Sequence, residues 1–276
     1  MSDLVTRRVR GVAVYGRHRP STGDPTDGAT HRVVLVHGSM DRGASFVKVG
    51  RRLDDLEVVR YDRRGYGRSV EAGAGTVADH VADLLAVLDD RAAVVVGHSF
   101  GGVLAILAAL ARPDLVPAVG AYESPMPWAP WWPRTSAGAR AVETAGAHGA
   151  DAAAEAFLRR MIGDERWERL PRATKDARRA EGEALLTELR EMRATEALDD
   201  AAQLPFPVVA GRGSVGDAHH REAADRLAAA APLGELVVID GAGHAAHSTH
   251  PDEFAALVRR AVDRAGPDPG RRGGGR

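Results

Sequence analysis

Short hydrophobic runs recur along the chain and are separated by segments with helical periodicity. Apolar runs of this length, bounded by turn residues, are typical of strands buried on both faces of a sheet. The sequence predicts such strands at 33–36, 58–61, 94–96, 118–122, 208–210 and 236–239. An alternating pattern at 9–15 predicts one more strand, half exposed at an edge of the sheet.

The segments between these runs carry the spacing of helices. Thr76 and Asp79 form a capping-box pattern before an apolar stripe, so we expect a helix over 77–88. Residues 101–111 are apolar on every side and predict a buried helix. Further helices are predicted at 44–53, at 218–231 and from Pro251 onward. Strands that alternate with helices in this way predict a parallel sheet with helical crossovers.

One long segment interrupts the alternation. Residues 125–202 contain no convincing strand; they open with prolines and tryptophans and then become rich in alanine, arginine and glutamate. We therefore predict an α/β fold with a mostly parallel central sheet flanked by helices, built from residues 1–124 and 203–265, with a helical cap inserted at 125–202. The Gly-, Pro- and Arg-rich tail at 266–276 lacks core-forming residues and is predicted to be disordered.

Composition narrows the classes of function. Lys and Arg number 37 against 38 Asp and Glu, and the net charge of −1 offers no general attraction to nucleic acid or to an anionic membrane. Cysteine is absent, which excludes disulfides, thiolate metal sites and a cysteine nucleophile. The sequence has no signal-peptide pattern and no apolar run long enough to cross a bilayer, so we expect a soluble, cytoplasmic monomer or homodimer.

The pentapeptide Gly97-His98-Ser99-Phe100-Gly101 matches the G-x-S-x-G pattern of a nucleophile elbow. It lies between a predicted buried strand and a predicted buried helix, which is the setting that the motif requires. The serine of such an elbow sits on a tight, strained turn, and side chains at 97 or 101 would collide with neighbouring backbone. We interpret Ser99 as a nucleophile, with the Phe100 N–H at a helix N-terminus facing a developing oxyanion.

With this motif in place, the chain resembles the α/β-hydrolase family over roughly residues 7–265. The strand at 33–36 leads into His37-Gly38, which is similar to the family's strand ending in His-Gly; the resemblance implies that Ser39 provides the second oxyanion N–H. Residues 62–69 and 241–244 are similar to the family's Asp-x-Arg-Gly-x-Gly-x-Ser turn and its catalytic-histidine loop. The implied serine chemistry needs no metal and no organic cofactor, and the sequence shows no metal-ligand cluster of suitable spacing.

A serine hydroxyl needs a base to take its proton, and His244 is the expected one. It follows the last predicted strand on a Gly-rich loop, at the carboxyl end of the sheet where ligands bind in such folds. His247 and His250 are nearby rivals, although His250 precedes Pro251 and is expected to help start a helix. The remaining candidates are expected to pack or to lie exposed on a helix: His98 in the first role, His219 and His220 in the second.

The acid that orients the histidine is the open question. The family usually supplies it just after the strand at 208–210, but this chain has Ser214 at that position. Glu123, at the end of an earlier strand, lies in a segment similar to the one that carries the acid of haloalkane dehalogenases, and we favour it. Asp217 is the alternative, and its ordinary role would be a helix N-cap. The chain is not a dehalogenase, because those enzymes carry Asp where this one has Ser99.

These residues predict a serine hydrolase that cleaves an ester, thioester or lactone bond of a small apolar or aromatic substrate through an acyl-enzyme. Trp128, Trp131 and Trp132 at the start of the cap, together with Met126 and Phe157, are expected either to line the substrate pocket or to join the cap to the core. Three alternatives remain: a carbon–carbon bond hydrolase or an acyltransferase with the same triad, or a binding protein of the same fold without turnover.

Overall fold

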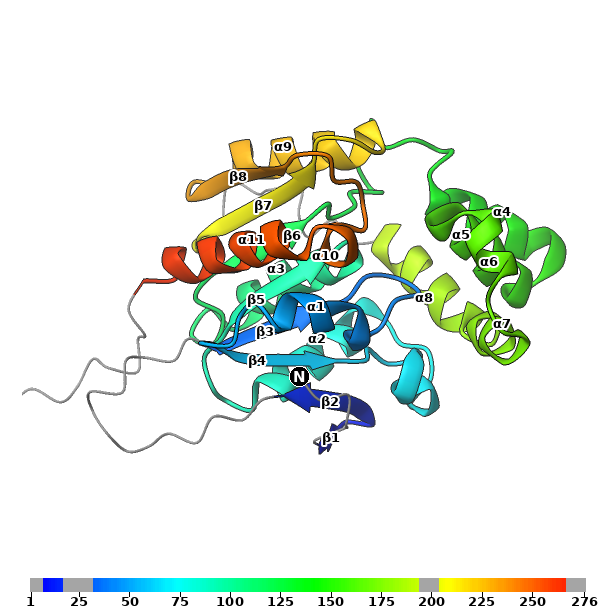
Figure 1. Cartoon of the computed structure of the whole chain (residues 1–276), viewed down its shortest axis with the longest axis horizontal. Coiled ribbons are helices and arrows are strands. Elements are labelled where there is room, and N and C mark those ends of the chain that lie inside the picture. Colours follow the sequence, from blue (N-terminus) through cyan, green and yellow to red (C-terminus); the bar gives the residue numbers. More distant parts are fainter. Residues whose placement is uncertain (1–6, 17–31, 194–203, 267–276) are drawn as a thin grey trace, which may run out of the picture.

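The computed structural model describes residues 7–16, 32–193 and 204–266; the predicted tail after Gly266 and the far end of the predicted cap lie outside the described residues. Eight strands form one sheet in the order β1-β2-β4-β3-β5-β6-β7-β8 (Figure 1). The strands are β1 Arg7–Val9, β2 Val12–Gly16, β3 Arg32–Val36, β4 Glu57–Tyr61, β5 Val94–His98, β6 Val119–Tyr122, β7 Val208–Gly213 and β8 Gly234–Ile239. All pairs from β4 to β8 in that order are parallel, which confirms the predicted fold class.

The N-terminal edge differs from the prediction of a single strand over 9–15. The segment is a hairpin in which β1 pairs antiparallel with β2, and β2 pairs antiparallel with β4. Arg10 and Gly11 turn the chain with φ angles of 49° and 84°. Two consecutive residues with positive φ suit the right-handed twist of a tight hairpin, but an arginine in that conformation gives little signal in the sequence.

Helices cover both faces of the sheet because its strands are apolar on both. Val34 and Val36 of β3 pack into one hydrophobic core, whereas Val33 and Leu35 pack into another. The first core contains α2 (Val77–Leu88), α3 (Phe100–Ala111) and α9 (Ala218–Ala230). The second contains η1 (Gly43–Phe46), α1 (Val47–Gly50), α10 (Ala246–Thr249) and α11 (Pro251–Arg264). A further short helix, η2 (Gly67–Ala72), follows β4.

Two of the predicted helix starts are found, while one predicted helix is shorter than expected. Thr76 accepts a hydrogen bond from the Asp79 N–H and the Asp79 side chain accepts one from the Thr76 N–H, so the capping box of α2 is present. Pro251 occupies the first turn of α11. The helix expected over 44–53 is the pair η1 and α1, which ends at Gly50.

Between β6 and β7, the described residues 125–193 form five helices and contain no strand. The helices are α4 (Ala137–His148), α5 (Ala150–Ile162), α6 (Asp164–Glu168), α7 (Arg172–Arg179) and α8 (Gly182–Arg193). These helices, hereafter the cap helices, gather at one end of the sheet (Figure 1). Trp167 of α6 is fully buried among them. No helix of the described residues is both long and apolar enough to span a membrane.

Buried ion pairs join the cap helices to the core. Glu188 of α8 accepts a hydrogen bond from Arg63 over 2.9 Å, and both side chains are fully buried. Glu181, just before α8, accepts hydrogen bonds from Arg42 over 2.5 Å and from the Gly67 N–H over 3.0 Å. Moving α8 would leave these buried carboxylates without their partners, which is strongly destabilising. The contacts therefore hold α8 in one position over the carboxyl end of the sheet.

Candidate active site

The chain turns sharply between β5 and α3, and Ser99 lies on the turn. Its backbone angles are φ 55° and ψ −127°, a strained conformation for a residue with a side chain. A Cβ at Gly97 would lie 2.1 Å from the carbonyl carbon and oxygen of Gly101, and one at Gly101 would lie 2.2 Å from the Val36 oxygen. The predicted collisions at both glycines are confirmed. The turn lifts Ser99 away from the strand, and Ser99 lines a pocket that also contains His244.

Phe100 and Ser39 are the residues expected to offer backbone N–H groups near Ser99. Phe100 is the first residue of α3, so its N–H has no partner within the helix. Ser39 belongs to the loop after β3 and lines the same pocket as Ser99. His37 braces this loop as a neutral ring: Nδ1 donates to the Gly38 oxygen over 2.8 Å, and Nε2 accepts from the Arg63 N–H over 2.8 Å. Burial and the nearby Arg63 lower the pKa of His37 to about 4, so the ring keeps that acceptor near neutral pH.

The structure brings His244 and Glu123 together. The Nδ1 atom of His244 lies 2.7 Å from Oε2 of Glu123, and Oε1 of the same carboxylate accepts from the Gly213 N–H over 3.0 Å. Glu123 is 1% exposed and has a φ of 46°, which turns its side chain at the end of β6. Because a carboxylate only accepts here, Nδ1 of His244 carries the proton and Nε2 keeps a lone pair.

Among the described residues, neither Ser214, at the position where the family usually has its acid, nor the alternative acid Asp217 makes a hydrogen bond or ion pair with the His244 side chain. Ser214 donates to Asp240 over 2.9 Å and accepts from the Gly241 N–H over 2.8 Å, so it joins two loops. Asp217 lines the pocket, but its side chain is half exposed and its nearest ionic partner is Arg160 at 3.9 Å. It stands at the N-cap position of α9 without making a side-chain cap. Of the two candidate acids, only Glu123 contacts His244 among the described contacts.

Several further histidine rings surround His244, and the sequence did not anticipate two of them. His98 packs as expected, and its Nε2 lies 2.8 Å from the His244 carbonyl oxygen. His219 and His220 were expected to be exposed on a helix; instead both line the pocket, and the His220 ring centroid lies 4.4 Å from that of His244. Burial lowers the pKa of His98 and of His220 well below the ordinary value. Both rings therefore stay neutral beside His244 and do not repel a charge on it.

The two rival histidines lie outside the lining of the pocket that contains Ser99. His250 is the N-cap residue of α11, as expected. His247 in α10 is 4% exposed, and its Nε2 lies 3.3 Å from Oδ2 of Asp41. Neither residue lines the pocket that contains Ser99 and His244.

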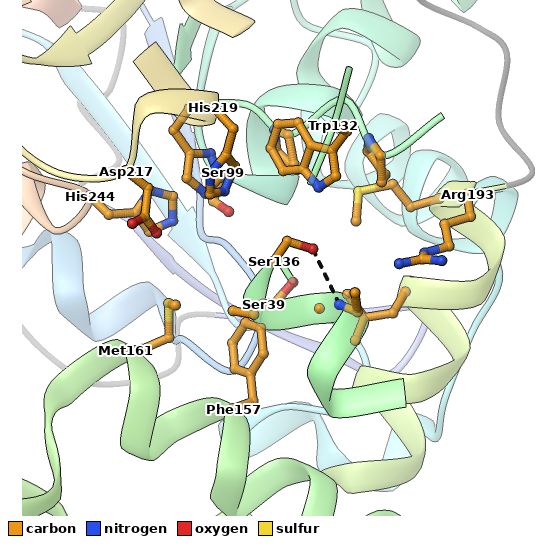
Figure 2. A pocket seen from close by; sticks show the side chains of 18 residues that line it. Ser39, Ser99, Trp132, Ser136, Phe157, Met161, Arg193, Asp217, His219 and His244 are labelled. Atoms are coloured by element: carbon orange, nitrogen blue, oxygen red, sulfur yellow. Dashed lines mark hydrogen bonds between the residues drawn. The ribbon is translucent and has the colours of Figure 1, made fainter. Parts of the chain in front are cut away.

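A pocket opens beside Ser99, between the core and the cap helices (Figure 2). Ser99 and His244 lie at one side of it, and Arg193 of α8 lies at the opposite side (Figure 2). Its apolar lining comes mostly from cap side chains: Trp132, Phe157, Met161, Leu189 and Met192.

The expectation for the pocket lining holds for Trp132 and Phe157 and needs correction for three residues. Met126, Trp128 and Trp131 do not line the pocket. Met126 is 7% exposed and packs in the hydrophobic core. Trp131 lies under the Arg226 guanidinium, 5.0 Å from it, and Trp128 packs against the core from its edge. The chain turns within this stretch, so neighbouring tryptophans face different surroundings.

Two groups of described side chains have the composition of a metal site, although their members lie far apart in sequence. Glu123, His220 and His244 form one group, and it is part of the pocket already described. Asp41, His98 and His247 form the other, and none of these three residues lines the pocket. The separation of their members along the chain is the reason that spacing alone did not reveal them.

The sequence of the chain is similar to those of known hydrolases. The sequence model described as "Alpha/beta hydrolase family" matches residues 33–257. The chain is similar to lipase LipV of Mycobacterium tuberculosis, with 40% identity over 91 residues that cover 32% of this chain and 35% of the lipase. It therefore spans about a third of the length of that relative. It is also similar to a pimeloyl-[acyl-carrier protein] methyl ester esterase of Yersinia pestis, with 27% identity over 82% of this chain and 91% of the esterase.

Solved structures show the same fold. The crystal structure of the enol-lactonase from Burkholderia xenovorans LB400 superimposes with a TM-score of 0.70 and 21% identity, over 92% of this chain and 98% of that chain. At that identity the likeness concerns the fold alone. The family match, which covers most of the chain, agrees with the elbow at Ser99 and the ordering of the sheet. The chain belongs to the alpha/beta hydrolase family.

Proposed function

We propose that the chain is a serine hydrolase that cleaves an ester-type bond through an acyl-enzyme on Ser99. The observation that carries the proposal is the contact between His244 Nδ1 and the buried Glu123 carboxylate, 2.7 Å apart, beside a pocket that also contains Ser99. This contact leaves Nε2 of His244 as the free base. The nucleophile Ser99, the acid Glu123 and the base His244 then occur in that order along the chain.

In the first half of the reaction, Ser99 Oγ attacks the carbonyl carbon of the substrate while Nε2 of His244 takes the hydroxyl proton. The ring becomes an imidazolium, and the Glu123 carboxylate stabilises it and fixes its orientation. The neutral rings of His98 and His220 flank His244 without adding positive charge. The N–H groups of Ser39 and Phe100 hold the oxyanion; removal of one such donor typically costs about 3 kcal/mol.

Collapse of this first tetrahedral intermediate breaks the bond between the carbonyl carbon and the leaving group, which takes the proton from His244, and the acyl group stays on Ser99. In the second half, a water molecule loses a proton to Nε2 of His244 and attacks the ester carbon, and the oxyanion forms again at the same two N–H groups. Collapse of this second intermediate breaks the bond from carbon to Ser99 Oγ, His244 returns its proton to that oxygen, and the acid is released.

The lining of the pocket supports an apolar or aromatic acyl group. Phe157 and Met161 face the space beside Ser99, and Trp132 lies above it (Figure 2). Leu189 also lines the pocket. Flexible methionine side chains adapt to groups of different shape, and aromatic rings offer large contact areas. The relatives whose names denote a lipase and a methyl ester esterase support an ester-type bond as the target.

A panel of p-nitrophenyl esters tests this function. We expect kcat/KM to rise from acetate to octanoate and benzoate, and we expect Ser99→Ala to lose the activity. Trp132→Ala should lower kcat/KM for the larger esters about tenfold, because it removes apolar contact area from the pocket. Trp131→Ala is the matched control, since this ring lies outside the pocket, and it should change kcat/KM little. Equal losses in the two tryptophan variants would contradict the assignment of the acyl pocket.

A further inference from the structure

Three side chains converge near the proposed triad: Asp41, His98 and His247. His247 packs against Phe46 and Phe254, which belong to the hydrophobic core of α1, α10 and α11. Asp41 lies in the loop that follows β3, His98 is the last residue of β5, and His247 lies in α10. These are the loops and ends that also carry Ser39, Ser99 and His244. The mechanism proposed above uses neither Asp41 nor His247.

The three side chains have the spacing of metal ligands. One ligand atom from each lies within 4.8 Å of the other two. Oδ2 of Asp41 and Nε2 of His247 are 3.3 Å apart, which is longer than the 2.7 Å between His244 and Glu123. Ligand atoms that bind a tetrahedral zinc ion at about 2.0–2.1 Å lie roughly 3.3 Å from each other. The Asp41–His247 separation therefore fits two ligands of one ion better than a short charged hydrogen bond.

The hydrogen bonding of His98 leaves one of its ring nitrogens free. Its Nε2 lies 2.8 Å from the His244 carbonyl oxygen, and a carbonyl can only accept, so Nε2 carries the proton. Nδ1 then holds a lone pair, and this buried atom has no hydrogen-bond partner among the described residues. A ring that donates through one nitrogen to a backbone carbonyl and points the other at an ion is the usual arrangement of a metal-binding histidine.

Neighbouring groups hold the other two ligands in place. The Ser45 hydroxyl donates to Asp41 Oδ2 over 2.9 Å, which orients the carboxylate. The His247 ring packs against the rings of Phe46 and Phe254, with centroids 5.1 and 6.0 Å away. The Asp41 side chain is 25% exposed, whereas His247 is 5% exposed, so an ion has access from the Asp41 side.

We propose that Asp41, His98 and His247 form a binding site for a zinc-class divalent cation, with a fourth position open to water. Two imidazoles and one carboxylate are a donor set that zinc accepts. The ion would tie the loop after β3 to the end of β5 and to α10. It would thereby stabilise the framework that positions Ser39, Ser99 and His244, without contact with the substrate.

Isothermal titration of the untagged, chelator-treated chain with ZnCl₂ tests the proposal without reference to catalysis. We expect one ion per chain, and a Kd at least tenfold weaker in Asp41→Asn and in His247→Gln, two variants that keep the size of the side chain. His220→Gln is the matched control, because it removes a histidine from the other metal-like group, and its Kd should equal that of the native chain. At zinc concentrations a hundredfold above Kd, the Tm of the native chain should rise by about 5 °C or more, and that of Asp41→Asn by much less.

Each other outcome overturns the proposal. Native affinity in both Asp41→Asn and His247→Gln would show that zinc does not bind at this place. Loss of binding in His220→Gln alone would assign the ion to the pocket histidines. Absence of a binding isotherm with the folded native chain, at millimolar zinc, would show that Asp41 and His247 form only an ion pair.

Discussion

At the scale of single residues, Glu123 shows how a backbone conformation selects a role. Its φ of 46° is unusual for a residue with a side chain, and such outliers persist only where surrounding contacts hold them. Here the Glu123 N–H donates to the Gly211 oxygen over 2.8 Å, and the carboxylate accepts from Gly213 N–H and contacts His244. The residue is therefore fixed at both its backbone and its side chain, between β6, β7 and the histidine loop.

If Glu123 is the acid, replacing its carboxylate by an amide removes the group that stabilises the imidazolium and fixes its tautomer. We expect Glu123→Gln to lower kcat on a p-nitrophenyl ester by about 10³ to 10⁴-fold. Asp217→Asn, which alters the other acid candidate, should change kcat by no more than a few fold. Circular dichroism would confirm that both variants are folded. A loss of orders of magnitude in Asp217→Asn, with little change in Glu123→Gln, would reverse the assignment.

The sequence located the residues of the elbow and of the histidine loop, because their motifs are local. It did not locate the neighbours that depend on the tertiary fold. His219 and His220 belong to a helix whose composition favours exposure, yet the Trp132 ring comes within 4.5 and 5.2 Å of them and shelters the pair. Trp132 lines the pocket and the adjacent Trp131 does not. The path of a proline-rich loop decides this, and no periodicity in the sequence encodes that path.

At the scale of elements, the passage from β5 to α3 depends on close approach of backbone segments. The missing side chains at Gly97 and Gly101 allow the start of α3 to rest against the end of β5 and the end of β3. The predicted strands and helices of the core correspond to observed elements because each carries a continuous apolar run or stripe. The hairpin at Arg10 and Gly11 was missed because its turn contains no strong turn signal apart from one glycine.

Gly97→Ala tests the elbow as a packed element. The added Cβ would lie 2.1 Å from Gly101 backbone atoms, so backbone must move; we expect the free energy of unfolding to fall by about 3 kcal/mol or more. Gly146→Ala in α4 is the control, because a Cβ there meets nothing within 4 Å. Alanine in a helix interior should raise stability by about 0.5–1 kcal/mol. Urea denaturation measures both; similar stability of the two variants would refute the steric account.

At the scale of the whole molecule, the parallel sheet brings the ends of β3, β5, β6 and β7 to one edge, where the proposed site is assembled. The cap helices close this edge from above, and their apolar side chains form most of the pocket lining. The existence of an inserted helical segment followed from the loss of strand pattern after residue 124. The sequence did not predict where this helical segment lies over the sheet. Its position depends on contacts such as the buried pair Arg63–Glu188, which joins residues 125 positions apart.

Buried neutral histidines make the stability of the whole chain depend on pH. The unfolded chain protonates His37 near pH 6.5, whereas the folded chain does so only near pH 4. Between these values the unfolded state binds more protons, so the free energy of unfolding rises with pH, by up to about 1.4 kcal/mol per pH unit for this group, and levels off above pH 6.5. Protonation would also break the hydrogen bond from the Arg63 N–H to His37 Nε2.

Urea unfolding at several values between pH 4 and 7.5 measures this slope. In His37→Gln the slope should be smaller than in the native chain, since the titrating group is gone while an amide oxygen can still accept from Arg63. His148→Gln, at an exposed position at the end of α4, should keep the native slope. An unchanged slope in His37→Gln would show that other groups cause the acid sensitivity.

The central claim is that Ser99 is a nucleophile activated by His244, and covalent labelling addresses it most directly. Intact-mass spectrometry after treatment with a fluorophosphonate should show one phosphonyl adduct per native chain, mapped by peptide sequencing to Ser99, and none on Ser99→Ala. His244→Ala should be labelled far more slowly, because the hydroxyl has lost its base. A native chain that stays unlabelled, or an adduct that forms equally well on Ser99→Ala, would contradict the account.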